Sequence, residues 1–259
     1  MLRHTSEIKG YGIAARDGPI GSVCDYLFDD QAWRVRWVVV DTGALLPGKK
    51  VLIAPMVLGD IDSGESRFRV RLTVDQVKHS PGVDTDAPVS RQMEGDVYDY
   101  YGWSPYWTSG LFMGGYAYAG GTMGAPLAMD LARPGHGDAD GQKPEGDPHL
   151  RSVNEVRGYH IHATDGEIGH VSDVVIEDED WSLRYLVVDT QNWWPGRKVL
   201  IAPRLVETVD WATRRVTLSV DRQTVQDSPA YDPSVTIDRA YENRFHDYFT
   251  RQPKPEPVD

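Results

Sequence analysis

Three histidines near the middle of this chain of 259 residues have the type and spacing that could bind a metal ion. His160, His162 and His170 form the one local histidine cluster, and a metal site needs three or four converging ligands. A two-residue turn at Asp165-Gly166 pairs residues whose numbers sum to 331, so His170 projects from the sheet face opposite to His160 and His162. We therefore expect structural or surface histidines and no metal, unless a bulge at Gly169 changes this register.

Carboxylates and a thiol are the next candidates for chemistry. The pair Asp41-Thr42 recurs as Asp189-Thr190, in each case at the end of an apolar run. Catalysis by a carboxylate needs a second positioned group, and none is evident in the sequence, so we expect these side chains to cap a loop. Cys24 lies within a predicted strand and is replaced by Ser172 in the second half, which gives no sign of a reactive thiol.

Arginines within apolar runs raise the question of anion recognition. Arg36 and Arg184 lie in such runs, where an ion pair with a neighbouring acid is the simpler expectation. The sequence holds no phosphate-binding Walker loop, no nucleophile elbow and no His-Glu-x-x-His motif. We predict that the protein is not an enzyme and that it uses no cofactor.

The charge balance excludes some classes of partner. Lys and Arg number 27 and Asp and Glu number 39, so the formal net charge is −12. This argues against broad binding to nucleic acid or to anionic lipid, both of which need clustered Lys and Arg. The single cysteine excludes an internal disulfide, the first residues show no apolar core of the kind expected in a signal peptide, and no stretch of about 20 predominantly apolar residues is found. We expect a cytoplasmic protein with no transmembrane segment.

The elements that must position these residues occur twice. At an offset of 148, 26 of the 49 positions from Glu7 to Pro55 are identical to those from Glu155 to Pro203. The longest shared block runs from Lys50 to Pro55 and returns from Lys198 to Pro203. Each unit is about 95 residues long, which is long enough for a small domain. The pattern indicates a duplication.

Within each unit the pattern is mostly β. Asp17-Gly18 and Asp165-Gly166 predict type I′ hairpin turns, and strands are expected over residues 8–15, 20–28, 34–41 and 50–54. The alternation from Phe68 to Val74 predicts a further strand. Short strands joined by tight turns suggest a small closed barrel.

A helix is expected after each barrel. Apolar residues at spacings of four, four and three predict one apolar helix face in each unit: Val89, Met93, Val97 and Tyr100, and then Ile237, Tyr241, Phe245 and Tyr248. The fold class is therefore mainly β, with two small β-barrels, each followed by a short amphipathic helix.

Four segments follow from this division. Residues 1–101 form the first barrel with its helix, and residues 152–250 form the second. Between them, residues 102–151 are rich in aromatic residues and glycine and then in acidic residues, proline and glycine, as expected of a linker. Residues 251–259 form a proline-rich tail that we expect to be disordered.

The repeated motif resembles the PRC-barrel domain, which is named after the photosynthetic reaction-centre H subunit. The resemblance covers both barrels, from Gly10 to Pro55 and again from Gly158 to Pro203, and leaves out the linker and the tail. The positions that carry it are Gly10, Asp17, Gly18, Gly21, Asp41, Pro55, Gly158, Asp165, Gly166, Gly169, Asp189 and Pro203.

The resemblance implies a protein-binding module without catalytic activity, because PRC-barrel domains are known chiefly as protein-contact platforms. We expect an adaptor or scaffold that binds an unknown protein partner, with the barrels packed as an internal pseudo-dimer or the chain forming a homo-oligomer. One alternative is a peripheral, H-subunit-like component of a membrane electron-transfer complex. Another is a ribosome-assembly factor, since the family includes the C-terminal domain of the ribosome maturation factor. A small-molecule site between the barrels is the last alternative.

Loop aromatics are the candidate contact residues. Trp193 and Trp194 stand before Pro195-Gly196, where the first unit has two leucines, and Tyr106-Trp107 lies in the linker. Large apolar side chains on a turn either fold back onto the barrel or meet a partner, and Trp and Tyr are enriched among interface anchors. We therefore take Trp193, Trp194, Tyr106 and Trp107 as candidate protein-binding residues.

Overall fold

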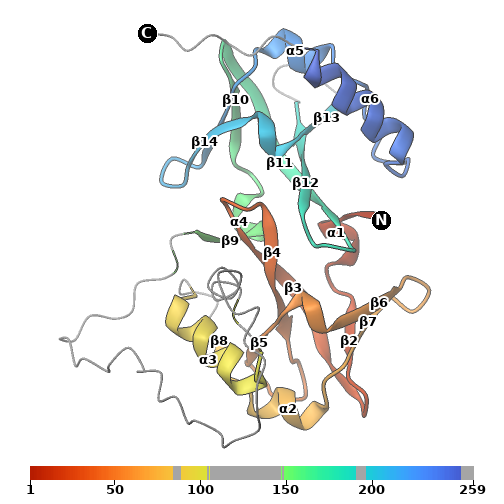
Figure 1. The fold of residues 1–259 in the computed structure, drawn as a ribbon, viewed down its shortest axis with the longest axis vertical. Coiled ribbons are helices and arrows are strands. Elements are labelled where there is room, and N and C mark those ends of the chain that lie inside the picture. Colours follow the sequence, from red (N-terminus) through yellow and green to blue (C-terminus); the bar gives the residue numbers. More distant parts are fainter. Residues whose placement is uncertain (84–88, 104, 106–146, 148, 191–196, 252–259) are drawn as a thin grey trace, which may run out of the picture.

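The protein is mainly β and contains two sheets, one in each half of the chain. The computed structural model describes residues 1–83, 89–103, 105, 147, 149–190 and 197–251. Trp193, Trp194, Tyr106 and Trp107 lie outside the described residues. The two sheets form two lobes stacked along the longest axis of the molecule (Figure 1).

The strands of the two sheets follow the same order. The first sheet, from edge to edge, consists of β6 (Leu58–Asp62), β7 (Arg67–Val70), β2 (Gly12–Ala14), β3 (Pro19–Asp29), β4 (Arg34–Asp41), β5 (Lys50–Ile53) and β8 (Gly82–Val83). The second consists of β14 (Val206–Asp210), β15 (Arg215–Leu218), β10 (His160–Ala163), β11 (Gly166–Glu177), β12 (Leu183–Asp189) and β13 (Lys198–Ile201). In both sheets the pairs are antiparallel except for the parallel pairs β2–β7 and β10–β15.

Helices and short 3₁₀ turns follow the strands in both halves. The first half has α1 (Thr5–Ile8), η1 (Pro55–Val57), α2 (Val74–His79) and α3 (Arg91–Tyr101). The second half has α4 (Val153–Val156), η3 (Pro203–Leu205), α5 (Arg222–Gln226) and α6 (Arg239–Thr250). The expected helices thus correspond to α3 and α6, whereas α1, α2, α4 and α5 were not predicted.

Both faces of strand β4 are buried, which explains its run of four apolar residues from Trp37 to Val40. Val38 and Val40 of β4 belong to the large core inside the sheet. Trp37 and Val39 point to the other face, where they pack with Val97 of α3 in a second core. A strand that is covered on both sides needs no polar alternation, so α3 covers the outer face of its own sheet.

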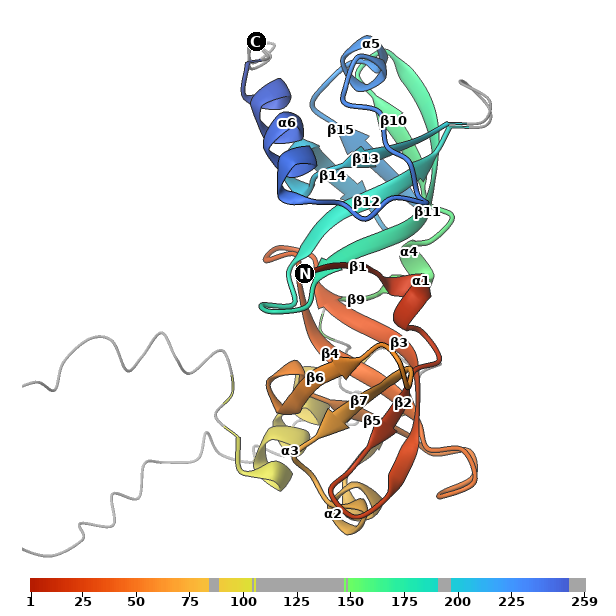
Figure 2. The ribbon, with the colours of Figure 1, turned by 90° about the vertical axis from the view of Figure 1, so that its right-hand side faces the viewer.

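Each half of the chain contributes a strand to the sheet of the other half. β1 (Leu2–His4) pairs antiparallel with β11, and β9 (Leu150–Ser152) pairs antiparallel with β3. Figure 2 shows both short strands at the junction between the lobes. Residues 2–4 fall within the first predicted domain, yet they add a strand to the second sheet. Residues 150–151 fall within the predicted linker, yet they belong to a strand of the first sheet.

The local geometry differs from the prediction at the start of each unit. A strand was expected over residues 8–15, but Thr5–Ile8 is helical and the strand starts at Gly12. Gly10 separates the two elements with a φ of +85°, which a residue with a side chain rarely adopts. The alternation from Phe68 to Val74 also ends early, because Thr73 caps α2 through a capping box with Gln76.

The predicted type I′ turns are wrong. That turn needs a positive φ at both central residues, and neither Asp17 nor Asp165 has one. These aspartates instead cap the next helix: Asp17 Oδ1 accepts from the Val74 N–H at 2.8 Å, and Asp165 Oδ1 accepts from the Arg222 N–H at 2.9 Å. The repeated Asp-Gly pair therefore fixes the helix that follows the barrel strands, some 57 residues later in the sequence.

Each hairpin contains a bulge, and the glycine at each bulge lies close to the backbone of the next strand. The register shifts between Ile13 and Ala14 in the first sheet and between Ile161 and His162 in the second. A Cβ on Gly21 would lie 2.0 Å from the Asp41 carbonyl oxygen. The same atom on Gly169 would lie 1.9 Å from the Asp189 carbonyl oxygen. Only glycine fits at these two positions.

Candidate protein-contact groove

Two equivalent tryptophans form the centre of the junction between the lobes. Trp33 and Trp181 lie 148 positions apart and both have a positive φ, of 51° and 60°. The Val35 N–H donates to the Trp181 carbonyl at 2.8 Å, and the Leu183 N–H donates to the Trp33 carbonyl at 2.7 Å. These reciprocal bonds join the β3–β4 turn of one half to the β11–β12 turn of the other.

The side chains at this junction belong to one continuous core. Trp181 is 8% exposed and stacks obliquely on Tyr26 and Phe68, which belong to the first half. Trp33 packs on Phe28 in a parallel arrangement. The large core therefore contains buried residues of both halves, and the surface near the junction is built from both halves.

Buried carboxylates hold the two exchanged strands in place. Asp173 of β11 accepts hydrogen bonds from Thr5 Oγ1 at 2.9 Å and from the Ser6 N–H at 3.3 Å, and it also contacts His4 and Arg157. Burial acts to raise the pKa of Asp173, but its hydrogen bonds, led by those from His4 and Ser6, hold that pKa well below the usual range.

The equivalent carboxylate in the first half is Asp25 of β3. It accepts from Ser152 Oγ at 2.5 Å and from the Asn154 N–H at 3.1 Å. Here burial outweighs the hydrogen bonds and raises the pKa of the Asp25 carboxyl. The two junction carboxylates therefore differ in their electrostatics although they occupy equivalent places.

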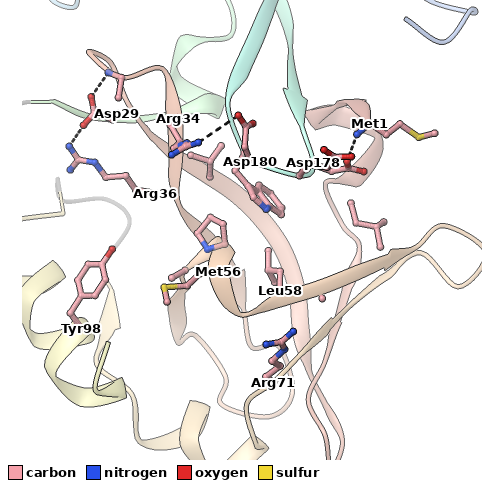
Figure 3. A pocket seen from close by; sticks show the side chains of 18 residues that line it. Met1, Asp29, Arg34, Arg36, Met56, Leu58, Arg71, Tyr98, Asp178 and Asp180 are labelled. Carbon is pink, nitrogen blue, oxygen red and sulfur yellow. Dashed lines mark hydrogen bonds and ion pairs between the residues drawn. The ribbon is translucent and has the colours of Figure 1, made fainter. Parts of the chain in front are cut away.

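A groove with a volume of about 1140 Å³ opens beside this junction (Figure 3). Its floor comes from the first half, where η1 and the start of β6 supply Pro55, Met56 and Leu58. Its opposite wall is the β11–β12 turn of the second half, with Asp178 and Asp180. The Met56 side chain is 65% exposed, which is unusual for a large apolar residue lying in a groove.

The polar rim of the groove is mostly fixed by ion pairs. Asp178 Oδ2 accepts from Arg3 Nε at 2.9 Å, and Arg34 reaches Asp180 at 3.6 Å. Burial acts to raise the pKa of both aspartates, but hydrogen bonds and nearby arginines lower it. Arg71 on the far side of Met56 is exposed (Figure 3). The groove thus combines an apolar floor with charged edges of both signs.

A buried polar cluster attaches α3 to the sheet beside the groove. Glu94 is fully buried, accepts from Trp37 Nε1 at 2.6 Å and lies 3.4 Å from Arg36. Arg36 also contacts Asp29 and reaches Asp147 at 2.7 Å. In the second half Arg184 pairs with Glu242 at 3.2 Å. The expected ion pairs of Arg36 and Arg184 are confirmed.

The structure corrects the histidine register. His160 pairs directly with His170, because the bulge between Ile161 and His162 shifts the hairpin by one residue. Residues directly opposite each other in antiparallel strands project from the same face, so His170 does not point away from His160. His160 Nδ1 lies 2.9 Å from Glu167 Oε1, a contact that lowers the pKa of Glu167. Within the described ranges, no group of three or more His, Cys, Asp or Glu side chains is arranged to hold a metal ion.

The other candidate residues have structural contacts. Asp41 Oδ1 accepts from the Gly43 N–H at 2.8 Å, and the Thr42 hydroxyl lies within hydrogen-bond distance of the Leu46 and Lys49 carbonyl oxygens, at 2.8 and 2.7 Å. Burial raises the pKa of the Cys24 thiol, whose Sγ lies 3.4 Å from the Val39 carbonyl oxygen. A raised pKa leaves a thiol less reactive.

Sequence reasoning missed the residues that build the groove. Met56 follows the shared Ala-Pro pair and its counterpart is Arg204, so it belongs to no repeated pattern. Glu94 and Glu242 occupy equivalent positions, and this repeated acid on an otherwise apolar helix face was the available signal. Trp33 and Trp181 are also identical at the same offset.

Comparison with known families finds a match in the second half of the chain. Residues 148–224 match the PRC-barrel domain family. This PRC-barrel match starts just before β9, includes strands β10 to β15 and ends within α5, so α6 and the added strand β1 lie outside it. No match is found among curated proteins. Within the described part of the chain, no helix is long and apolar enough to cross a membrane.

Proposed function

We propose that this protein is a non-catalytic, cytoplasmic adaptor whose two halves are both PRC-type modules, packed as an internal pseudo-dimer. The PRC-barrel match of residues 148–224 supports this for the second half, and the common strand order of the two sheets extends it to the first. Because the halves exchange strands and share one core, we treat the whole chain as a single binding platform.

The exposure of Met56 in the junction groove carries the proposal. Methionine is flexible and polarisable, so it suits a surface that receives the apolar side chain of a partner. The rim offers Arg71 on one side and Glu179 and Asp180 on the other, so a partner can be oriented by charge. The occupant we propose is a protein segment that inserts an apolar side chain beside Met56 between these charged edges.

The test compares tagged variants recovered from the native host by quantitative mass spectrometry. Met56→Glu should lose a partner that the wild type retains, since a carboxylate there opposes insertion of an apolar group. Val235→Glu is the matched control, because Val235 is also about as exposed, at 61%, but lies away from the groove. Recovery of the same proteins with Met56→Glu as with the wild type would contradict the proposal.

The fraction in which the partner is found decides between the alternatives. Soluble, membrane and ribosomal fractions should be kept separate. A groove-dependent soluble partner is the expected result. A groove-dependent partner in a membrane complex or in the small ribosomal subunit would favour the H-subunit-like or ribosome-assembly alternatives instead.

The loop aromatics remain a second proposed contact surface. Replacement of Trp193 and Trp194 together by alanine should weaken an association if they meet a partner, since buried Trp anchors often contribute about 2 kcal/mol or more. Unchanged recovery of every partner with this double variant would contradict the role of these residues while leaving the role of Met56 intact.

A further inference from the structure

The second half has its own groove at the place equivalent to the first. It has a volume of about 660 Å³ and lies between the β3–β4 turn, β12, η3 and the first turns of α6. Pro203 takes the place of Pro55, and Arg204 takes the place of Met56. The apolar residue at the centre of the first groove is thus replaced by a cation in the second.

The lining of this second groove is basic, although the chain as a whole is acidic. Three arginines and one histidine line it, against the single acid Glu242: Arg184, Arg204, Arg239 and His246. Arg204, Arg239 and His246 are exposed, and the Arg184 side chain is 45% exposed. The chain carries a net charge of −12, so this local excess of positive charge runs against the overall balance.

Equivalent arginines in the two grooves differ in their burial and in the number of acidic partners that they contact. In the first half Arg36 is 8% exposed and is held by Asp29, Glu94 and Asp147. Its counterpart Arg184 contacts Glu242 through one nitrogen at 3.2 Å and is much more exposed. A guanidinium offers five N–H donors in a planar fork, so a single contact of this kind leaves room for a bound carboxylate.

The cations are positioned by contacts within the groove. Arg204 Nη1 lies 2.6 Å from His246 Nδ1, which holds the guanidinium over the α6 side of the groove. Arg239 is the first residue of α6 and follows the N-cap Asp238, whose carboxylate accepts from the Tyr241 N–H at 2.7 Å and so fixes the start of the helix that carries this guanidinium. Phe245 is buried below these side chains, and Trp33 and Pro203 border the same groove, so an apolar side chain fits among the cations.

We infer that this second groove binds an acidic peptide segment of a partner protein, with its carboxylates on Arg204 and Arg239 and an apolar side chain beside Trp33 and Pro203. Arg–carboxylate pairs are charge-assisted and directional, so they suit such a segment. The net charge of −12 disfavours a long polyanion such as nucleic acid. The inference goes beyond the proposed role of Met56, since it concerns a different groove.

Fluorescence polarisation of the full chain with a labelled peptide, Glu-Asp-Glu-Leu-Asp-Glu-Glu, tests the inference. Arg204→Met, which recreates the residue of the first groove, should weaken binding about tenfold, and Arg204→Met with Arg239→Gln should weaken it further. Arg69→Met removes the same charge from an exposed site on β7 and should leave the affinity within about twofold. Met56→Glu should also leave the affinity for the peptide unchanged. A failure of the acidic peptide to bind can therefore be told apart from a failure of the proposed role of Met56.

Several outcomes would overturn the inference. The first is that the wild type does not bind the peptide at about 0.15 M salt. The second is that Arg204→Met and Arg69→Met weaken peptide binding equally. The third is that the wild type binds a peptide with Asn and Gln in place of Asp and Glu with the same affinity. Tighter binding of a single-stranded oligonucleotide of equal charge would also overturn it and would favour nucleic acid. Unchanged far-ultraviolet circular dichroism of the exposed Arg204 variant is expected and shows that the loss is local.

Discussion

Four residues that are identical in the two halves fix the local backbone geometry of each half. Gly21 and Gly169 lie at bulges where the backbone of the next strand leaves no room for a Cβ. Asp17 and Asp165 cap the helices α2 and α5 from the hairpin turns. These residues are identical in both halves because each half has the same steric or hydrogen-bonding requirement at that position. We expect the stability of the protein to be most sensitive to substitution at these four positions.

Gly21→Ala should destabilise the protein by about 2 kcal/mol or more, because the new methyl group would lie 2.0 Å from a backbone oxygen and strands β3 and β4 would have to separate. Gly95→Ala is the matched control. Gly95 lies within α3 with no atom within 4 Å of an added Cβ, so this change should stabilise by up to about 1 kcal/mol. Urea unfolding measures both, and equal effects would contradict the steric account.

Asp173 and Asp25 should respond oppositely to pH. The pKa of Asp173 is lowered in the folded state, so its stabilising contribution is complete above the unfolded pKa of about 3.9 and is lost as the pH falls through the folded pKa. The pKa of Asp25 is raised by burial, so its contribution instead grows as the pH falls from its folded pKa towards about 3.9.

Asp173→Asn should therefore cost about 2 kcal/mol at neutral pH and should reduce the loss of stability below about pH 4. Asp25→Asn should cost less at neutral pH. Unfolding free energies measured from pH 3 to about pH 7 check both. An equal cost for the two variants at neutral pH would contradict the difference in their electrostatics.

At the scale of elements, helices attach to the sheets through buried acids as well as through apolar contacts. Glu94 joins α3 to Trp37 and Arg36 of β4, and Glu242 joins α6 to Arg184 of β12. The first set is almost fully buried, whereas the second is partly exposed. The two equivalent attachments should therefore differ in strength.

Glu94→Ala should destabilise the protein by about 3 kcal/mol, because it leaves the buried Arg36 and the Trp37 indole without one of their acceptors. Glu242→Ala should cost about 1 kcal/mol or less, since water can replace the carboxylate there. Urea denaturation followed by tryptophan fluorescence measures both costs. A larger loss for Glu242→Ala would contradict this ranking.

The strands and helices inside each unit could be predicted from the sequence more completely than the connections between units. Arg34–Asp41 was predicted to the residue because it contains four consecutive Trp and Val residues from Trp37 to Val40. The helices α3 and α6 followed from their apolar spacing, although Tyr100 is exposed and instead donates through its hydroxyl to the Gln76 carbonyl. The register of β10 was wrong because one bulge reverses the facing of every later residue.

The junction could not be predicted because its elements are too short to carry a pattern. β1 and β9 have three residues each, and α1 and α4 have four. Their pairing partners lie some 120 or more residues away in the chain. The groove beside them depends on this exchange, so Met56 could not be recognised as a surface residue from the sequence.

For the molecule as a whole, the exchange of strands makes the halves depend on each other. Deletion of Leu2–His4 removes the pairing of β1 with β11 and the contacts of His4 with Asp173 and Tyr231. We expect this deletion to speed amide hydrogen exchange in β11 of the second half more than in β4 of the first. Faster exchange confined to the first half would contradict the exchanged arrangement.

The junction groove is proposed here as a protein-contact site. Site-specific photo-crosslinking in the native host, with a benzophenone amino acid at position 56 or at position 235, tests it most directly. We expect a discrete protein adduct from position 56 and none of comparable yield from position 235, which is about as exposed. Equal labelling from both positions, or no adduct from position 56, would contradict it.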